Sequence, residues 1–327
     1  MCKNKVLDLS SYDEMGQITS IFGLFLPKHI DEYPNLRVLS SDMSYGARLD
    51  QFKEENPSKF INVGIAEQNL IGVAAGLTSE GYKCVTCAQA TFISMRSFEQ
   101  IRQYMSYQQY PIIVVGLSAG FLLQFMGNSH YAMEDISIMR SLPNITVLSP
   151  ADAGEAVLAF RYALSLNKPV YLRLTGTPDI PSVYTKYFNY SLKSNVLKKG
   201  VDIALFATGS MVYTALQVAK ILQEEQSLSV GVIDVHCLCP MDTKTIDVFS
   251  SCKLFVSLEE HYIEGGLGSI ISDYIAGQTG FPPLLKLGIR RQYSEVGDYN
   301  YLLEQHGLSV SDVAKTIIDR CNSYNIR

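Results

Sequence analysis

Apolar residues along the first 190 positions fall into short runs that are separated by longer amphipathic stretches. The short runs are rich in Val, Ile and Leu and predict strands at 37–40, 60–63, 83–86, 112–117, 145–149 and 170–174. The longer stretches have helical spacing at 11–30, 66–80, 91–106, 132–140 and 153–166. Strands that alternate with helices are typical of a parallel sheet covered on both faces.

This alternation breaks once and then resumes. Pro178, Pro181 and the tyrosine-rich stretch 184–190 predict a linker. Beyond the linker, strands are expected at 202–207, 230–235 and 254–258, with helices at 211–225 and after the glycine-rich stretch 265–268. That stretch lacks the lysine of a phosphate-binding loop, so we interpret it as a tight strand-to-helix turn. We therefore expect the α/β fold class, with two doubly wound domains at 1–190 and 191–327.

The composition of the 327-residue chain narrows the range of partners. Hydrophobic residues make up 47% and support a large core, and the net charge of −5 argues against nucleic acid as a partner. No run of 18 apolar residues occurs, which argues against a membrane span. No apolar signal segment follows Met1, so we expect a cytoplasmic protein.

The seven cysteines are odd in number, so we expect reduced thiols. Cys84 and Cys87 have the spacing of a metal or redox pair. No second Cys/His pair stands at zinc-site spacing, and both thiols lie in an apolar run, which favours packing in the core. We expect no metal ligand from this chain.

The segment from Phe60 to Asn69, Phe-Ile-Asn-Val-Gly-Ile-Ala-Glu-Gln-Asn, is the most informative stretch of the chain. A short apolar strand ends at Gly64, and Glu67 then opens a helix that is rich in Gly and Ala. A glutamate in the first helical turn is stabilised by the helix dipole, which is one interpretation. The other interpretation is a catalytic carboxylate that is presented from a strand-to-helix turn.

The Gly-Ile-Ala-Glu-Gln motif resembles the thiamine-diphosphate enzymes of the transketolase family. The resemblance extends from about residue 38 to the C-terminus and implies a pyrimidine-binding domain followed by a transketolase C-terminal-type domain. In that family the glutamate of the motif hydrogen-bonds the aminopyrimidine ring of thiamine diphosphate. The resemblance therefore implies that Glu67 is catalytic and binds the cofactor.

Three side chains after the next strand match the family's aromatic wall for the pyrimidine ring. Phe92 matches an aromatic position, Met95 replaces a second aromatic residue, and Phe98 follows one turn later. The resemblance implies that all three bind the cofactor, with a softer thioether contact at Met95. The alternative is that they form the buried face of an ordinary helix.

Two further residues resemble family motifs that lie near the cofactor or the substrate. Asp42 resembles the aspartate of an Ala-Asp-Leu motif near the cofactor, although it could instead be a helix N-cap. His130 resembles the histidine of a Gly-x-Thr-His motif that faces the substrate, where an imidazole can move protons. A helix-capping histidine is the alternative for His130.

The family's diphosphate and metal motif, Gly-Asp-Gly followed by a distant Asn, does not occur in this sequence. The chain thus resembles the C-terminal half of a transketolase. We expect thiamine diphosphate and Mg²⁺ to be held mainly by a separate subunit that carries the diphosphate-binding domain. An α2β2 heterotetramer is the expected assembly.

The substrate positions depart from those of sugar-phosphate transketolases. Ser118 and Met126 stand where the family has a histidine and an aspartate, and Gly176 stands where it has a phosphate-binding arginine, with Arg173 three residues earlier. We expect transfer of a two-carbon ketol unit to an aldehyde or sugar acceptor outside ordinary pentose-phosphate metabolism. Two alternatives stay open: the β subunit of a 2-oxo-acid dehydrogenase or a deoxyxylulose-phosphate-synthase-like enzyme, and a non-catalytic scaffold paralogue.

Overall fold

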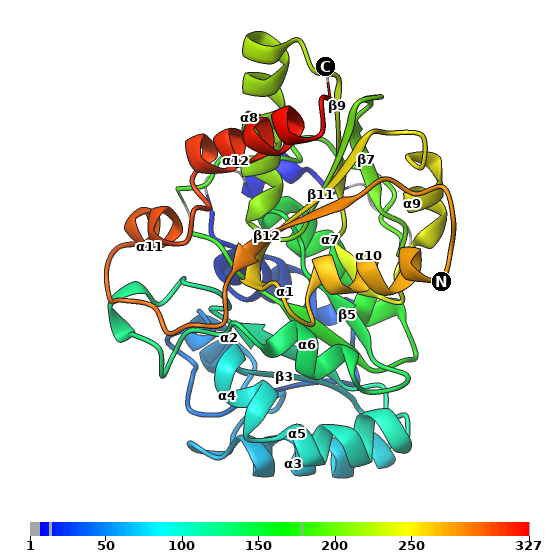
Figure 1. Ribbon diagram of the computed structural model, residues 1–327. Coiled ribbons are helices and arrows are strands. Elements are labelled where there is room, and N and C mark those ends of the chain that lie inside the picture. Colours follow the sequence, from blue (N-terminus) through cyan, green and yellow to red (C-terminus); the bar gives the residue numbers. More distant parts are fainter. Residues whose placement is uncertain (1–6, 13–14, 178, 327) are drawn as a thin grey trace.

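The computed structural model describes residues 7–12, 15–177 and 179–326. Two mainly parallel sheets organise the chain, with helices packed on their faces (Figure 1). This arrangement confirms the predicted α/β class. None of the helices in these residues is long and apolar enough to cross a membrane.

The first sheet has seven strands in the order β10-β5-β6-β4-β3-β1-β2. Its parallel members are β1 (Leu36–Ser40), β2 (Phe60–Asn62), β3 (Lys83–Gln89), β4 (Ile113–Leu117), β5 (Thr146–Leu148) and β6 (Val170–Arg173). Strands β4, β5 and β6 are buried along their whole length, which explains their continuous apolar runs.

Helices cover both faces of the first sheet. One face packs against η2 (Thr19–Phe25), α1 (Leu26–His29) and α7 (Ala153–Ser165). The other face packs against α3 (Glu67–Ser79), η4 (Ile101–Tyr107) and α6 (Asp135–Arg140). The remaining short helical segments of this half are η1 (Leu9–Tyr12), η3 (Ile30–Glu32), α2 (Asp50–Glu55), α4 (Ala90–Met95), α5 (Phe98–Gln100) and η5 (Gln124–Met126).

The second sheet has five strands in the order β12-β11-β8-β9-β7. These are β7 (Asn195–Lys198), which is antiparallel to its neighbour, β8 (Ile203–Ala207), β9 (Val230–Asp234), β11 (Leu254–Tyr262) and β12 (Leu284–Ile289). The helices of this half are α8 (Met211–Gln226), α9 (Thr243–Val248), α10 (Leu267–Ala276), α11 (Tyr299–Gln305) and α12 (Val310–Ser323).

The two sheets are joined by one short strand and by a common core. Strand β10 (Cys237–Cys239) follows β9 in the chain but pairs antiparallel with β5 of the first sheet. One hydrophobic cluster contains Val114 of the first sheet together with Phe206 and Phe255 of the second. The domain boundary between residues 190 and 191 stays a prediction. Strand β10, which lies after this boundary in the chain, belongs to the sheet of the first half.

The glycine-rich stretch 265–268 is the predicted strand-to-helix turn. Gly265 has φ +85°, and helix α10 begins two residues later at Leu267. The backbone N–H groups of Leu267 and Gly268 donate to the buried Glu259 carboxylate at 2.7 and 2.8 Å. A side chain of the protein thus binds the N–H groups that a phosphate would need.

The predicted cysteine pair is divided by the sheet. Cys84 and Cys87 both lie on β3, and residues three apart on a strand point to opposite faces. Cys84 packs in the cluster that contains α3, whereas Cys87 packs in the cluster that contains α7. Both thiols are buried and free, which agrees with the interpretation as core residues.

Candidate active site

The predicted site residues follow neighbouring strands of the first sheet at their carboxyl ends. Asp42 follows β1, Glu67 follows β2, and Phe92 lies in α4 directly after β3. His130 lies in the loop after β4. Carboxyl ends of parallel strands meet at one edge of a sheet, where α/β proteins commonly bind ligands. The topology thus brings all four residues to one edge.

The turn before Glu67 is fixed by hydrogen bonds to the loop after β1. Gly64 has φ +77°, a conformation that glycine adopts without strain. The Ser41 hydroxyl donates to the Gly64 carbonyl at 3.1 Å and accepts from the Ala66 N–H at 3.0 Å. The first residue of α3 is therefore held rigidly, and the Glu67 side chain is only 5% exposed.

Arg96 links Glu67 to the predicted aromatic wall. One guanidinium nitrogen, Nη1, lies 3.2 and 3.3 Å from the two Glu67 carboxylate oxygens. The guanidinium carbon lies 3.9 Å from the centre of the Phe92 ring. The Phe92 ring in turn contacts the His130 ring edge-on, with 5.2 Å between centroids. Glu67, Arg96, Phe92 and His130 thus form one connected group.

The geometry of Arg96 shows what this group can bind. Its guanidinium is flat, donates to a carboxylate and lies over an aromatic ring, and its side chain is half exposed. An aminopyrimidine ring needs the same two contacts, a hydrogen bond to Glu67 and an aromatic surface. The residues present therefore fit the pyrimidine of thiamine diphosphate once the arginine head moves toward solvent.

The predicted single helix over 91–106 is helical but interrupted at residues 96 and 97, and the interruption separates Phe92 from Met95 and Phe98 in their contacts. Helix α4 ends at Met95, α5 begins at Phe98, and a π-helical segment follows from Ile101. Met95 and Phe98 line a shallow hollow of about 430 Å³ together with residues of α6. Phe92 contacts Arg96 and His130 instead. The cofactor roles of all three stay predictions.

Asp42 is not a helix cap in this structure. It has φ +55° and exchanges two hydrogen bonds of 3.0 Å with the Asn62 side chain. The Asn62 oxygen also accepts from the Gly64 N–H at 3.0 Å. Asp42 thus supports the turn that presents Glu67. The next helix, α2, begins only at Asp50.

His130 is not a helix cap either, because α6 begins five residues later at Asp135 and has Glu134 as its N-cap. The Ser129 hydroxyl lies 2.9 Å from Nδ1 of His130. This contact leaves Nε2 available to a ligand. The histidine is partly buried, as a side chain that faces a binding site would be.

Arg173 is fully buried and cannot reach a substrate. Its guanidinium donates to the Asp135 carboxylate at 2.9 Å and to the Glu260 carbonyl at 2.9 Å. Asp135 also accepts from the Tyr171 hydroxyl at 2.8 Å. This arginine joins the first sheet to β11 and therefore has a structural role.

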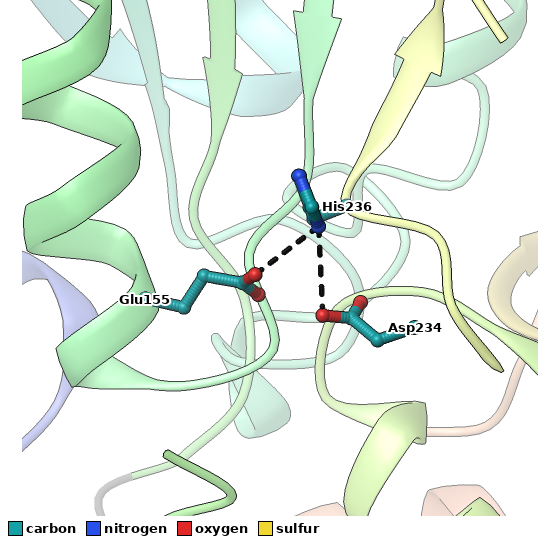
Figure 2. A group of neighbouring side chains, drawn as sticks. All are labelled: Glu155, Asp234 and His236. Atoms are coloured by element: carbon teal, nitrogen blue, oxygen red, sulfur yellow. Dashed lines mark ion pairs between the residues drawn. The ribbon is translucent and has the colours of Figure 1, made fainter. Parts of the chain in front are cut away.

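A second buried polar cluster consists of Glu155, Asp234 and His236 (Figure 2). Nδ1 of His236 lies 3.2 Å from Glu155 and 3.6 Å from Asp234, while Nε2 lies 2.8 Å from the Ser191 carbonyl. Burial and the charge of Asp234 raise the pKa of Glu155 well above its usual value.

The acidic neighbours of His236 favour the charged form of its imidazole. Burial lowers the pKa of His236, but the hydrogen bond and charge of Asp234 outweigh that effect, so the pKa is raised overall. The Tyr184 hydroxyl donates to Asp234 at 2.6 Å, and the Asn195 amide donates to Tyr184 at 2.8 Å. The cluster therefore fastens the linker segment to both halves of the chain.

Comparison with known proteins identifies the family of the chain. Residues 15–177 match the family model "Transketolase, pyrimidine binding domain", and residues 192–313 match "Transketolase, C-terminal domain". The chain belongs to the transketolase family.

Two relatives of this transketolase-family chain match it over most of their length. It is 34% identical over 289 residues to an apulose-4-phosphate transketolase subunit from Actinobacillus succinogenes, covering 87% of this chain and 91% of that one. It is 32% identical over 292 residues to a 6-deoxy-6-sulfo-D-fructose transketolase subunit from a Clostridium species, covering 88% and 89%.

A solved structure described as a split gene transketolase, inactive beta4 tetramer, has a TM-score of 0.82. It is 32% identical to this chain and covers 92% of this chain and 97% of that one. The described fold is therefore that of a split-transketolase subunit of similar length.

Proposed function

We propose that this chain is the pyrimidine-binding subunit of a two-subunit transketolase that uses thiamine diphosphate and Mg²⁺. The enzyme transfers a two-carbon ketol unit to an aldehyde or sugar acceptor outside the ordinary pentose phosphates. The observation that carries the proposal is the buried Glu67 carboxylate, which is held beside Phe92 and His130 at the carboxyl edge of the first sheet.

Thiamine diphosphate, when bound, supplies the carbanion stabilisation that C–C bond cleavage and formation require. Glu67 would hold the pyrimidine of the cofactor by a hydrogen bond and would share a proton with a ring nitrogen there. Ser41 and Asn62 hold the turn in front of Glu67, so that this proton is shared at a fixed position. The Arg96 guanidinium now covers the face of the Phe92 ring, and this face would contact the pyrimidine once the guanidinium has moved.

His130 acts on the substrate. Ser129 holds Nδ1, so Nε2 donates to or accepts from a substrate hydroxyl as the C–C bond breaks or forms. Ser118 and Met126 are uncharged, so neither offers the charged contact of sugar-phosphate transketolases. The names of the two relatives, which refer to apulose 4-phosphate and a sulfo-sugar, support an unusual acceptor or donor.

The partner subunit covers the carboxyl edge of the first sheet and holds the diphosphate and most contacts to Mg²⁺. Large apolar side chains are exposed in the loops at that edge: Tyr45 at 78%, Ile65 at 77%, Phe125 at 69% and Met126 at 54%. Exposed apolar groups of this kind mark protein interfaces. An α2β2 assembly would bury the edge twice by symmetry.

The proposal is tested by reconstitution with a chain that carries the Gly-Asp-Gly…Asn motif. Both chains are mixed with thiamine diphosphate, Mg²⁺ and a panel of ketose donors, with pyruvate as the donor typical of the alternative enzymes. Ketol transfer that needs both chains and the cofactor is expected. Turnover of pyruvate alone would favour a deoxyxylulose-phosphate-synthase-like or dehydrogenase subunit, and tight assembly without turnover would favour a scaffold.

A further inference from the structure

A small cavity opens at the same sheet edge, beside the loops that carry the candidate active site. Its volume is about 150 Å³, and its wall includes Thr19, Arg48, Leu122, Thr175 and Gly176. These residues come from η2 and from the loops after β1, β4 and β6. The loop that supplies Leu122 is the one that carries His130.

Among the described residues that line this cavity, Arg48 is the only charged one. Arg48 is exposed, and among the described residues its guanidinium has no ion pair and no hydrogen bond; its guanidinium carbon lies 5.8 Å from the centre of the Tyr45 ring. Its backbone has φ +57°, in the left-handed region that long side chains rarely adopt. The neighbours Ala47 and Leu49 are both fully buried and hold it there.

A strained residue with an unpaired charge at a cavity is typical of a binding site. The remaining wall is rigid, because Gln17 is buried and uses both ends of its amide. Its nitrogen donates to the Pro150 carbonyl at 2.9 Å, and its oxygen accepts from the Thr175 N–H at 3.0 Å. Arg48 therefore faces a preformed space with the hydroxyls of Thr19 and Thr175 in its wall.

The size and charge of the cavity limit its ligand. A volume of about 150 Å³ holds the end of a sugar with a single tetrahedral anion, whereas pockets for larger ligands are roughly 300 Å³ or more. Guanidinium groups bind phosphate and related oxyanions through paired hydrogen bonds. Arg173 directly precedes Leu174, Thr175 and Gly176 of the wall in the chain, but its guanidinium is already bound to Asp135.

We propose that Arg48 binds the terminal anionic group of the sugar substrate, a phosphate or a sulfonate, in this cavity. The proposal rests on the proposed function. It gives Arg48 the role of the phosphate-binding arginine that Gly176 replaces in this chain. It also argues against a nucleotide-linked substrate, because the cavity is too small for a base and a ribose.

The test uses the complete two-subunit enzyme and compares Arg48→Gln with Arg48→Lys and with wild type. For a substrate with a terminal phosphate or sulfonate, we expect KM to rise roughly 10- to 100-fold in Arg48→Gln, with kcat nearly unchanged. Arg48→Lys should recover part of the loss. For glycolaldehyde, which carries no anion, all three proteins should have the same KM. The phosphate and sulfonate substrates, assayed separately, distinguish the two anions.

A second measurement does not depend on turnover. Inorganic phosphate and sulfate are titrated into the complex by calorimetry, and we expect binding to wild type but not to Arg48→Gln. Arg102→Gln, which removes an exposed arginine paired with Glu99, serves as the control and should bind like wild type. Equal KM changes for charged and neutral substrates, or unchanged anion binding in Arg48→Gln, would overturn the proposal. Failure of turnover with every donor would instead count against the proposed function.

Discussion

At the scale of single residues, the site depends on one carboxylate that has two possible partners. Glu67 binds the Arg96 guanidinium in this structure, and the proposed chemistry needs it to bind the cofactor ring. A positive charge stabilises the ionised carboxylate, whereas the cofactor contact requires a shared proton. The ion pair must therefore open when the cofactor binds, and its energy opposes binding.

Replacing Arg96 by Gln should therefore strengthen cofactor binding. The Arg96 side chain is half exposed, so opening the pair costs only about 0–1 kcal/mol, and the dissociation constant of thiamine diphosphate should fall by up to about fivefold. Calorimetric titration of the two-subunit complex measures this, with Arg102→Gln as the control. Weaker binding in Arg96→Gln would mean that the arginine contacts the cofactor and does not move away.

Residue patterns in the sequence predicted part of this site and missed part. Glu67 was predictable because a motif fixes both the turn and the helix start around it. Arg96 was missed, although it lies four residues after Phe92, a spacing that places two side chains on the same side of a helix. The left-handed backbone conformation of Arg48 could not be predicted from the sequence, because it depends on the burial of its neighbours Ala47 and Leu49.

At the scale of elements, strand β11 carries charged groups into the region between the sheets. Its residues Glu259, Glu260 and His261 are all buried. The sequence pattern ends the strand at Leu258, because a run of charged residues is usually exposed. The strand continues to Tyr262 because backbone N–H groups of other segments donate to each of these side chains: Leu267 to Glu259, Phe121 to Glu260 and Ser137 to His261.

His261 should make the protein sensitive to mild acid. Burial lowers the pKa of its imidazole to about 4, and the neutral ring lies 2.7 Å from the Tyr262 carbonyl. Above pH 6.5 the ring is neutral in both states and has no effect. Between pH 6.5 and 4 only the unfolded chain binds the proton, so stability decreases as the pH decreases, by about 3 kcal/mol in total.

Denaturant titrations at pH 7.5, 6 and 4.5 test this expectation. In His261→Gln the proton-linked loss is removed, so its stability should fall less than that of wild type over this range. A variant that is weakened equally at all three values would show that the ring has only a packing role.

The segment between Thr91 and Ser106 shows why some helix boundaries could not be predicted from the sequence. Its apolar positions fit one helix, yet the structure breaks it at Arg96 and Ser97 and widens the last part into a π-helix. No Gly or Pro marks the break. Tertiary contacts outweigh local preference here, because the half-exposed Arg96 bonds to Glu67 of α3.

At the scale of the whole molecule, two halves of the chain are held in one arrangement by buried polar contacts. Asp135 and Arg173 are at most 1% exposed and bond to each other, and Arg173 also bonds to β11. Their pairing could not be predicted, because it joins residues that are 38 positions apart in the chain and lie on different elements.

Asp135→Asn should destabilise the protein by about 3–5 kcal/mol, because it leaves the charge of Arg173 buried without compensation. Chemical denaturation of the isolated chain measures the change. Glu99→Gln, which removes an exposed partner of Arg102, is the control and should leave the midpoint where it is. Equal midpoints for both variants would contradict a structural role for the buried pair.

The proposed partner surface can be tested with two tyrosines of equal exposure. Tyr45 and Tyr107 are both 78% exposed, but Tyr45 follows β1 at the carboxyl edge, whereas Tyr107 precedes β4 at the opposite edge. Tyr45→Asp should weaken association with the partner subunit at least tenfold, as loss of a central interface aromatic does. Tyr107→Asp should associate like wild type in ultracentrifugation, and a reversed result would move the interface to the other edge.

The role of Glu67 is tested most directly by the exchange of the C2 proton of thiamine diphosphate with deuterium in the assembled complex. NMR of quenched samples follows this exchange without any sugar substrate. We expect rapid exchange in wild type and a loss of about 100-fold or more in Glu67→Ala, with an unchanged fold and assembly. Exchange at the wild-type rate in a complex of Glu67→Ala that still binds the cofactor would contradict the account.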